Sequence, residues 1–229
     1  MEKTWFVSLF GCIGLIALLR ANQAKILKTA QGSSTPKIKL SDELLEGDVF
    51  EIFVSPADRF KFNAAHFIAY KGFRECLHGH NYSVSVKLIG RRLGHDGYLL
   101  DFGDVKTVVT KLCKELNEKF ILPVYSDALE ITYDGKQVNL VCEDRSQFSF
   151  PRTDVAELPI FHSSAEEISR YLWKRIISEF TPETLLSRGI HTLQICVAEM
   201  PNQQACFRRA VSHEHVIDDT LSNEIRGCL

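Results

Sequence analysis

The sequence lacks several patterns that would indicate a function directly. It contains no glycine-rich phosphate loop of the P-loop or dinucleotide-binding type. It has no basic excess, because 27 lysines and arginines stand against 29 acidic residues and the net charge is -2. No internal repeat recurs at the period of about 20 to 50 residues that marks solenoid proteins. The composition therefore gives no support to a nucleic-acid partner, which usually requires a basic surface.

The seven cysteines include no pair with C-x-x-C spacing. With 229 residues, 45% of them hydrophobic, the chain is long enough to bury a core without disulfide bonds. We therefore expect neither a disulfide framework nor a cysteine zinc site. Mostly buried free thiols in a reducing compartment are predicted instead. The cysteines stand at positions 12, 76, 113, 142, 196, 206 and 228.

Residues 5–19 form an apolar run near the N-terminus. As a helix this run reaches about 22 Å, short of the roughly 30 Å hydrocarbon core of a bilayer. Lys3 precedes it, and Arg20, Lys25 and Lys28 follow it. A signal peptide, an uncleaved anchor and a buried or disordered extension all fit such a segment. In an anchor, these charges would favour a cytoplasmic position for everything that follows.

A polar stretch separates this run from the rest of the chain. Residues 20–45 have the composition of a linker, so segment 1–45 is set apart from a folded domain at 46–229. We expect the domain to be cytoplasmic. Membrane anchoring and the secretory pathway stay open as alternatives, and they depend on residues 5–19 alone.

Periodic patterns predict an α+β domain in the order strands, helix, strands, helix, strands. Residues 81–89 alternate between apolar and polar, as a strand does, and residues 98–102 continue as strand. Two apolar stripes at helical spacing predict two helices. The first begins at Asp104, and the second is capped by Ser163 or Ser164.

Turn signals predict how some strands pair. Residues 49–54 and 59–66 flank a Ser-Pro-Ala-Asp turn, and we expect them to form a hairpin. A second hairpin is predicted around Asp134 and Gly135. Later strands are expected at residues 192–200 and 206–211.

Three of the eight histidines fall within fifteen positions, at His66, His78 and His80. Because His78 and His80 are two apart, a strand would point both to one face. Three neutral imidazoles can hold a zinc ion and leave its fourth position open to water or substrate, as in catalytic zinc sites. The sequence therefore predicts a metal site at these residues.

Five segments in order resemble the 6-pyruvoyl-tetrahydropterin synthase family, which includes 6-carboxy-tetrahydropterin synthase. The resemblance covers about residues 49 to 211. It is carried by FNAAH at 62–66, HGHNY at 78–82, GYLLDFGDVK at 97–106, SSAEE at 163–167 and VAEM at 197–200.

This resemblance implies a T-fold, in which an antiparallel sheet carries two helices on one face and subunits assemble into rings, commonly hexamers. It implies that His66, His78 and His80 bind Zn²⁺. It further implies that Glu199 anchors the pterin, with Ser164 at the substrate. The implied substrate is 7,8-dihydroneopterin triphosphate, which loses triphosphate or is cleaved in its side chain.

The sequence departs from the family at the expected base. Common members carry a cysteine four to six residues before the first histidine of His-x-His, and residues 72–74 contain none. Glu75 stands three residues before His78, which resembles a branch that uses a glutamate base and makes 6-hydroxymethyl-dihydropterin. The neighbouring Cys76 remains an alternative base, although adjacent residues on an extended chain face opposite ways.

A second departure lies after the first predicted helix. The family's Asp-His pair is replaced by Asn117 and Glu118. We expect Glu118 to move protons in place of the histidine, with His162 as the alternative. An insertion is expected around residues 122–160. The altered relay also leaves open a catalytically inactive homologue that binds zinc or pterin.

Overall fold

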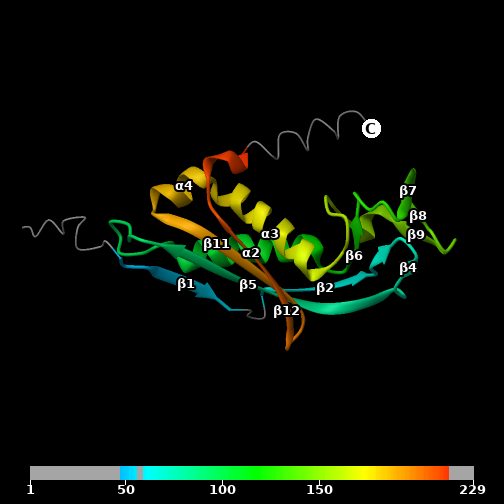
Figure 1. Cartoon of the computed structure of the whole chain (residues 1–229), viewed down its shortest axis with the longest axis horizontal. Helices are drawn as coiled ribbons and strands as arrows, with labels where there is room; N and C mark the ends of the chain where they lie inside the picture. Colours follow the sequence, from blue (N-terminus) through cyan, green and yellow to red (C-terminus); the bar gives the residue numbers. More distant parts are fainter. Residues whose placement is uncertain (1–46, 56–58, 217–229) are drawn as a thin grey trace, which may run out of the picture. The chain divides into compact units, whose positions relative to one another are not determined.

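A curled seven-stranded sheet forms the centre of the computed structural model, which describes residues 47–55 and 59–216 (Figure 1). The strand order is β10-β6-β2-β5-β11-β12, with β1 also paired to β5. Neighbouring strands are antiparallel, except that β6 runs parallel to both β2 and β10. The strands are β1 Phe50–Val54, β2 Lys61–His66, β5 His78–Gly90, β6 Lys119–Pro123, β10 Val155–Leu158, β11 Ile190–Met200 and β12 Gln203–Ala210.

β5 pairs with both strands that the sequence predicted to form a hairpin, residues 49–54 and 59–66. The predicted hairpin is therefore wrong. β1 and β2 both pair with β5, β1 along residues 86–90 and β2 along residues 78–83. With 13 residues, β5 reaches about 43 Å and can carry two short strands in succession along one edge. A local turn signal does not specify which strand becomes the partner.

Helices α2 (Phe102–Leu116) and α3 (Ala165–Phe180) lie on one face of the sheet (Figure 1). The predicted alternation of β5 is confirmed, because Tyr82, Val84 and Leu88 are at most 1% exposed and pack into the core under these helices. The fold is therefore the predicted α+β class with two helices on one face. The parallel position of β6 is a feature that the expected antiparallel sheet did not include.

The start of α2 differs from its prediction. Asp101, not Asp104, is the N-cap, and its carboxylate accepts a hydrogen bond from the main chain of Gly103. Residues 98–101 are therefore not strand, and Asp104 lies in the first turn, where a negative charge suits the helix dipole. For α3 the prediction is confirmed. The Ser164 hydroxyl caps it by accepting from the main-chain N–H of Glu167.

A separate three-stranded antiparallel sheet occupies residues 129–151. Its first two strands meet at the predicted Asp134-Gly135 turn, where Gly135 has a φ of 56°. Its apolar face forms a second core, which includes Phe67, directly after β2, and Phe120 of β6. The strands are β7 Leu129–Asp134, β8 Gln137–Cys142 and β9 Gln147–Pro151, followed by the 3₁₀ turn η2 Arg152–Asp154.

A short hairpin, β3 (Ala69–Tyr70) and β4 (Phe73–Arg74), joins β2 to β5. Its turn includes Gly72 with a φ of 81°, a conformation that L side chains rarely adopt. Glu75 follows this hairpin directly. The position of the predicted base therefore depends on how the hairpin is held.

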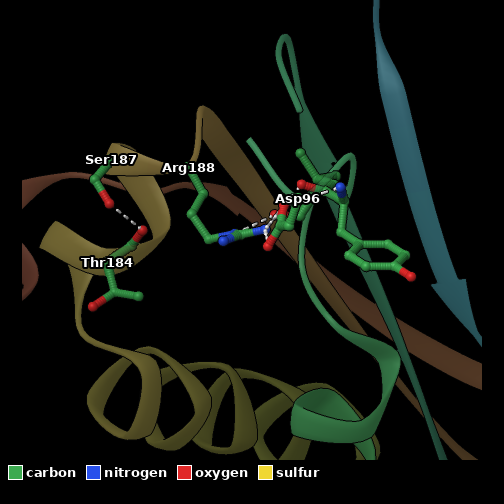
Figure 2. Close-up of polar contacts among 6 residues, drawn as sticks. Asp96, Thr184, Ser187 and Arg188 are labelled. Atoms are coloured by element: carbon green, nitrogen blue, oxygen red, sulfur yellow. Dashed lines mark hydrogen bonds and ion pairs between the residues drawn. The ribbon is translucent and has the colours of Figure 1, made fainter. Parts of the chain in front are cut away.

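Arg188 holds the loop between β5 and α2, which begins after the C-terminal residue of β5. It follows α4 (Pro182–Ser187), and its guanidinium donates to both carboxylate oxygens of Asp96 at 3.0 Å (Figure 2). It also donates to the carbonyls of Tyr98 at 2.9 Å and Leu99 at 2.8 Å. One side chain thus bonds to three residues of the loop that leads into α2. The described part of the chain ends with the 3₁₀ turn η3 (His213–Val216).

The prediction of mostly free thiols did not include one disulfide bond that the structure shows. Cys196 and Cys206 lie opposite each other on β11 and β12 and form a disulfide bond. The spacing of ten residues shows this only once the two strands are known to pair in that register. Among the other described cysteines, Cys76 is an exposed thiol, whereas Cys113 and Cys142 are buried.

No helix within residues 47–55 and 59–216 is long and apolar enough to cross a membrane. The apolar run at residues 5–19 and the expected linker at 20–45 lie outside the described residues.

Candidate functional site

The three predicted histidines converge where β2 and β5 pair. His66 lies opposite His78, and Ala64 lies opposite His80, so all three rings gather at one end of the strand pair. One ring nitrogen from each histidine lies within 4.8 Å of the others. Alternation along β5 places His78 and His80 on one face, as the sequence predicted.

Hydrogen bonds fix the tautomer of two of these rings. His66 donates from Nδ1 to the Ser163 carbonyl at 2.9 Å, and His78 donates from Nδ1 to the Cys76 carbonyl at 2.9 Å. A ring that donates from Nδ1 keeps its Nε2 lone pair for a metal. The His66 Nε2 is buried and has no hydrogen-bond partner among the described residues. A buried polar atom of this kind fits a metal ligand.

Electrostatics favour the neutral form that metal binding needs. Burial lowers the pKa of His66, and the nearby His78 and His80 lower it further. The hydrogen bond to Ser163 and the charge of Glu75 act in the opposite direction. His66 therefore stays uncharged at neutral pH. A neutral imidazole is the form that ligates metals.

A cleft of about 370 Å³ opens beside the histidines. Five of the residues predicted from the sequence to form the site line it: His66, Glu75, His78, Ser164 and Glu199. The described lining residues are His66, Ile68, Glu75, His78, Ser164, Ala165, Glu166, Glu199, Gln203, Gln204 and Ala205. Strands of the main sheet, the two residues that flank the β3–β4 hairpin and the start of α3 thus contribute to one cleft.

Glu75 and Glu199 enter the cleft from different elements. Glu75 accepts a hydrogen bond from the main-chain N–H of Ile68 at 3.0 Å. Glu199 lies near the end of β11, where the register against β12 shifts between Ala198 and Met200. Its carboxylate oxygen is 4.0 Å from Nε2 of His80. The cleft therefore presents two carboxylates next to the histidine cluster.

His80 belongs to the histidine cluster but does not line this cleft, and three further predicted residues do not line it either. Glu118 is exposed at the turn between α2 and β6, with a φ of 59°. The Cys76 thiol is exposed, and this residue contributes its carbonyl to His78 instead. His162 directs Nδ1 to the Ala69 carbonyl at 3.1 Å.

Sequence reasoning missed a structural role for Ser163, which it treated as a helix cap. Ser163 is fully buried, its carbonyl accepts from His66, and its hydroxyl donates to the Phe67 carbonyl at 2.9 Å. It also missed Gln203 and Gln204, two amide side chains that line the cleft from β12. The double serine before α3 was the available signal for Ser163. Nothing in the sequence indicated that β12 would reach the cleft.

Residues 57–210 match the family model of 6-pyruvoyl tetrahydropterin synthase. The chain belongs to the 6-pyruvoyl tetrahydropterin synthase family. Its segments FNAAH and HGHNY, on which the resemblance rested, hold the three converging histidines. Membership in this family also agrees with the curled sheet and its two helices.

Individual relatives agree with this assignment. The 6-pyruvoyl tetrahydropterin synthase of Plasmodium falciparum is 45% identical, with a TM-score of 0.69 over 71% of this chain and 99% of that chain. A Plasmodium vivax structure with a catalytic glutamate replaced by alanine is 43% identical, with a TM-score of 0.69, covering 72% and 99%. A Methanocaldococcus jannaschii protein provisionally named 6-carboxy-5,6,7,8-tetrahydropterin synthase is 31% identical over 65% of this chain and 90% of its own length.

Proposed function

We propose that the chain is a zinc-dependent pterin synthase that acts on 7,8-dihydroneopterin triphosphate. One observation carries this proposal. The His66 Nε2 is buried without a partner in a cluster of three histidines, and the adjoining cleft contains Glu75 and Glu199. A three-nitrogen set with an open side is typical of catalytic zinc.

The roles of the residues follow from their chemistry. Zinc held by His66, His78 and His80 would act as a Lewis acid toward the hydroxyls of the substrate side chain. Glu199 accepts two parallel hydrogen bonds from adjacent N–H donors of the pterin edge, an arrangement that suits a carboxylate. Glu75 takes up a proton from the substrate side chain. The Ser164 hydroxyl, at the start of α3, contacts the substrate.

Glu75 is the preferred base over Cys76. Glu75 lines the cleft with His66 and His78, whereas Cys76 is exposed and is not among the lining residues. A catalytic glutamate in the P. vivax relative supports a glutamate base. Because Glu75 replaces the family's usual cysteine, cleavage of the substrate side chain is the favoured outcome.

Glu118 is proposed as a second proton-transfer group that serves the cleft of a neighbouring subunit. It is exposed and lies outside the cleft of its own chain. A homo-oligomeric ring, commonly a hexamer in this family, would bring such a residue to a site at a subunit interface. This assembly is part of the proposal. The region around residues 122–160, which includes the three-stranded sheet, is likewise proposed as an insertion relative to compact family members.

The test is to incubate purified, zinc-loaded protein with 7,8-dihydroneopterin triphosphate and identify the product by mass. A 6-hydroxymethyl product supports the proposal in full; it forms when the C1′–C2′ bond of the side chain breaks and the phosphate chain leaves on the two-carbon aldehyde fragment. A 6-pyruvoyl or 6-carboxy product keeps the enzyme class and changes the reaction. No turnover, together with retained pterin binding, supports the alternative of an inactive homologue that binds zinc and pterin.

A further inference from the structure

Arg74 links the proposed base to the three-stranded sheet. We propose that Arg74 is a positioning residue, through which the β8–β9 turn holds Glu75 in the orientation that proton transfer requires. This inference rests on the proposed function, because it assigns a purpose to the placement of Glu75. It gives the three-stranded sheet a role in the reaction although that sheet contributes no residue to the described lining of the cleft.

The guanidinium of Arg74 bonds to both sides of this link. Nη1 donates to the Glu75 carbonyl at 2.7 Å. Nε donates to the Asp144 carboxylate at 2.9 Å, and Nη2 donates to the Ser146 hydroxyl at 3.0 Å. The planar fork of arginine can make such divergent bonds at once, whereas the ammonium of lysine cannot reproduce them.

The same guanidinium also contacts two aromatic rings. It lies 5.8 Å from the ring centre of Phe67 and 5.5 Å from that of Phe148, both within the range of cation–π contacts. The Arg74 side chain is only 18% exposed. Phe67 directly follows the predicted ligand His66, so the aromatic contact connects the arginine to the strand that carries the metal site.

The carboxylate partner of Arg74 is itself fixed. The main-chain N–H of Ser146 donates to Asp144 at 2.9 Å, and this bond and the bond from Arg74 lower the pKa of Asp144. A second tie runs beside the first, because the Gly72 N–H donates to the Glu143 carboxylate at 2.5 Å. The β8–β9 turn therefore bonds to the β3–β4 hairpin at two residues, Gly72 and Arg74.

The β3–β4 hairpin is too short to be stable without such contacts. β3 and β4 pair through only two residues each, and an isolated two-stranded hairpin is marginally stable even when it is longer. Glu75 leaves this hairpin with its carbonyl bonded to Arg74 and its N–H bonded to the Ile68 carbonyl at 2.9 Å. Loss of the arginine would release one of these two main-chain anchors and displace the carboxylate.

The first experiment compares steady-state kinetics of R74M and a matched control, R152M. Arg152 also pairs with a carboxylate, Glu157 at 3.1 Å, and stacks on Tyr133 at 4.9 Å, but it makes no bond to Glu75. We expect R74M to lower kcat by about 10- to 100-fold, as a displacement of about 1 Å does. KM and zinc content should stay within about twofold of wild type, as should all parameters of R152M. An unchanged kcat in R74M would overturn the proposal.

A double-mutant cycle separates positioning from general damage. If Arg74 acts through Glu75, then R74M added to E75Q lowers kcat no further than E75Q alone. If the two losses multiply, Arg74 acts independently and the proposal is wrong. A fully active E75Q would instead refute the assignment of Glu75 as the base, which is a failure of the proposed function and shows in E75Q without any change at Arg74.

Hydrogen exchange decides the case in which E75Q has no measurable turnover. We expect the segment 68–77 to exchange faster in R74M than in the wild type, with R152M matching the wild type. The seven-stranded sheet should keep its protection. Unchanged exchange in residues 68–77 of R74M would refute the positioning role, because the anchor on Glu75 would then be dispensable.

Discussion

Glu75 and Ile68 bond to each other twice. The Glu75 N–H donates to the Ile68 carbonyl at 2.9 Å, and the Ile68 N–H donates to the Glu75 carboxylate at 3.0 Å. Ile68 lies two residues after His66, so the pair ties the proposed base to the strand of a proposed metal ligand. One carboxylate oxygen is occupied by this bond. Together with the bond from Arg74 to the Glu75 carbonyl, these two bonds hold the carboxylate in one direction before any substrate is present.

The metal site predicts a clear difference among histidine variants. H66A, H78A and H80A should each weaken zinc binding strongly. Removing a residue that only hydrogen-bonds to a metal ligand typically costs about 10- to 100-fold in affinity (about 1 to 3 kcal/mol), and loss of the ligand itself should cost more. H162A is the control, because His162 does not line the cleft and should keep full zinc content. Metal analysis of the purified proteins measures this. Equal zinc content in H66A and H162A would contradict the assignment.

The proposed sharing of sites between subunits predicts complementation. E75Q and E118Q should each lose most of their turnover, because general acid–base groups contribute roughly 10²- to 10⁴-fold. Mixed oligomers made by co-expression should regain activity, since about a quarter of the sites then combine an intact Glu75 with an intact Glu118 from the neighbour. Turnover is measured as release of the phosphate chain. Full activity of E118Q alone would remove this residue from catalysis.

Tyr82 predicts a stabilising substitution in the metal-free protein. Its ring is fully buried, and its hydroxyl has no hydrogen-bond partner among the described residues. Burial and the charges of Glu199 and Glu75 raise the pKa of Tyr82, so the hydroxyl stays protonated. Because an unpaired buried polar group costs about 1 to 3 kcal/mol, Y82F should raise the free energy of unfolding by about 1 kcal/mol.

Urea titration measures this effect, with Y133F as the control. The Tyr133 hydroxyl donates to the Glu157 carboxylate at 3.1 Å, so its removal should lower stability slightly. A Y82F protein that unfolds at a lower urea concentration than the wild type would show that the hydroxyl has a stabilising partner.

Asp96 predicts a stability that depends on pH. The bond from the Tyr98 N–H and the bond from Arg188 lower the pKa of the Asp96 carboxyl (Figure 2). A carboxyl with a lower pKa in the folded state stabilises the fold above its unfolded value of about 3.9, and this contribution disappears as the pH falls through the folded value. D96N should therefore melt below wild type at pH 7. The two Tm values should converge as the pH falls through the lowered pKa of the folded state, and a constant gap would contradict the shift.

The cysteines predict a graded reaction with iodoacetamide. The exposed Cys76 should react first, whereas burial raises the pKa of Cys113 to about 12 and leaves almost no thiolate at pH 8. Cys196 and Cys206 should react only after reduction, because they form a disulfide bond. Peptide mass spectrometry after timed alkylation reads out each site. Labelling of Cys206 without a reductant would contradict the disulfide.

Local patterns predicted those parts of the molecule that depend on neighbouring residues. The alternation of β5, the Ser164 cap and the Asp134-Gly135 hairpin each follow from a few consecutive residues, and all three are present. The same locality misplaced the start of α2. Asp101 and Asp104 are both good caps by composition, and the choice between them depends on where the loop held by Arg188 allows the helix to begin.

The sequence by itself determined the family, the three histidines and the presence of a glutamate three residues before His78, because these lie in short segments whose chemistry is fixed by residue type and spacing. Only the tertiary structure decided that β1 and β2 share β5, that Cys196 faces Cys206, and that Arg74 joins Glu75 to a distant turn. These relationships connect residues that are far apart along the chain. They arise from strand pairing and packing, which minimise exposed apolar surface over the whole domain and leave no local signal at either partner.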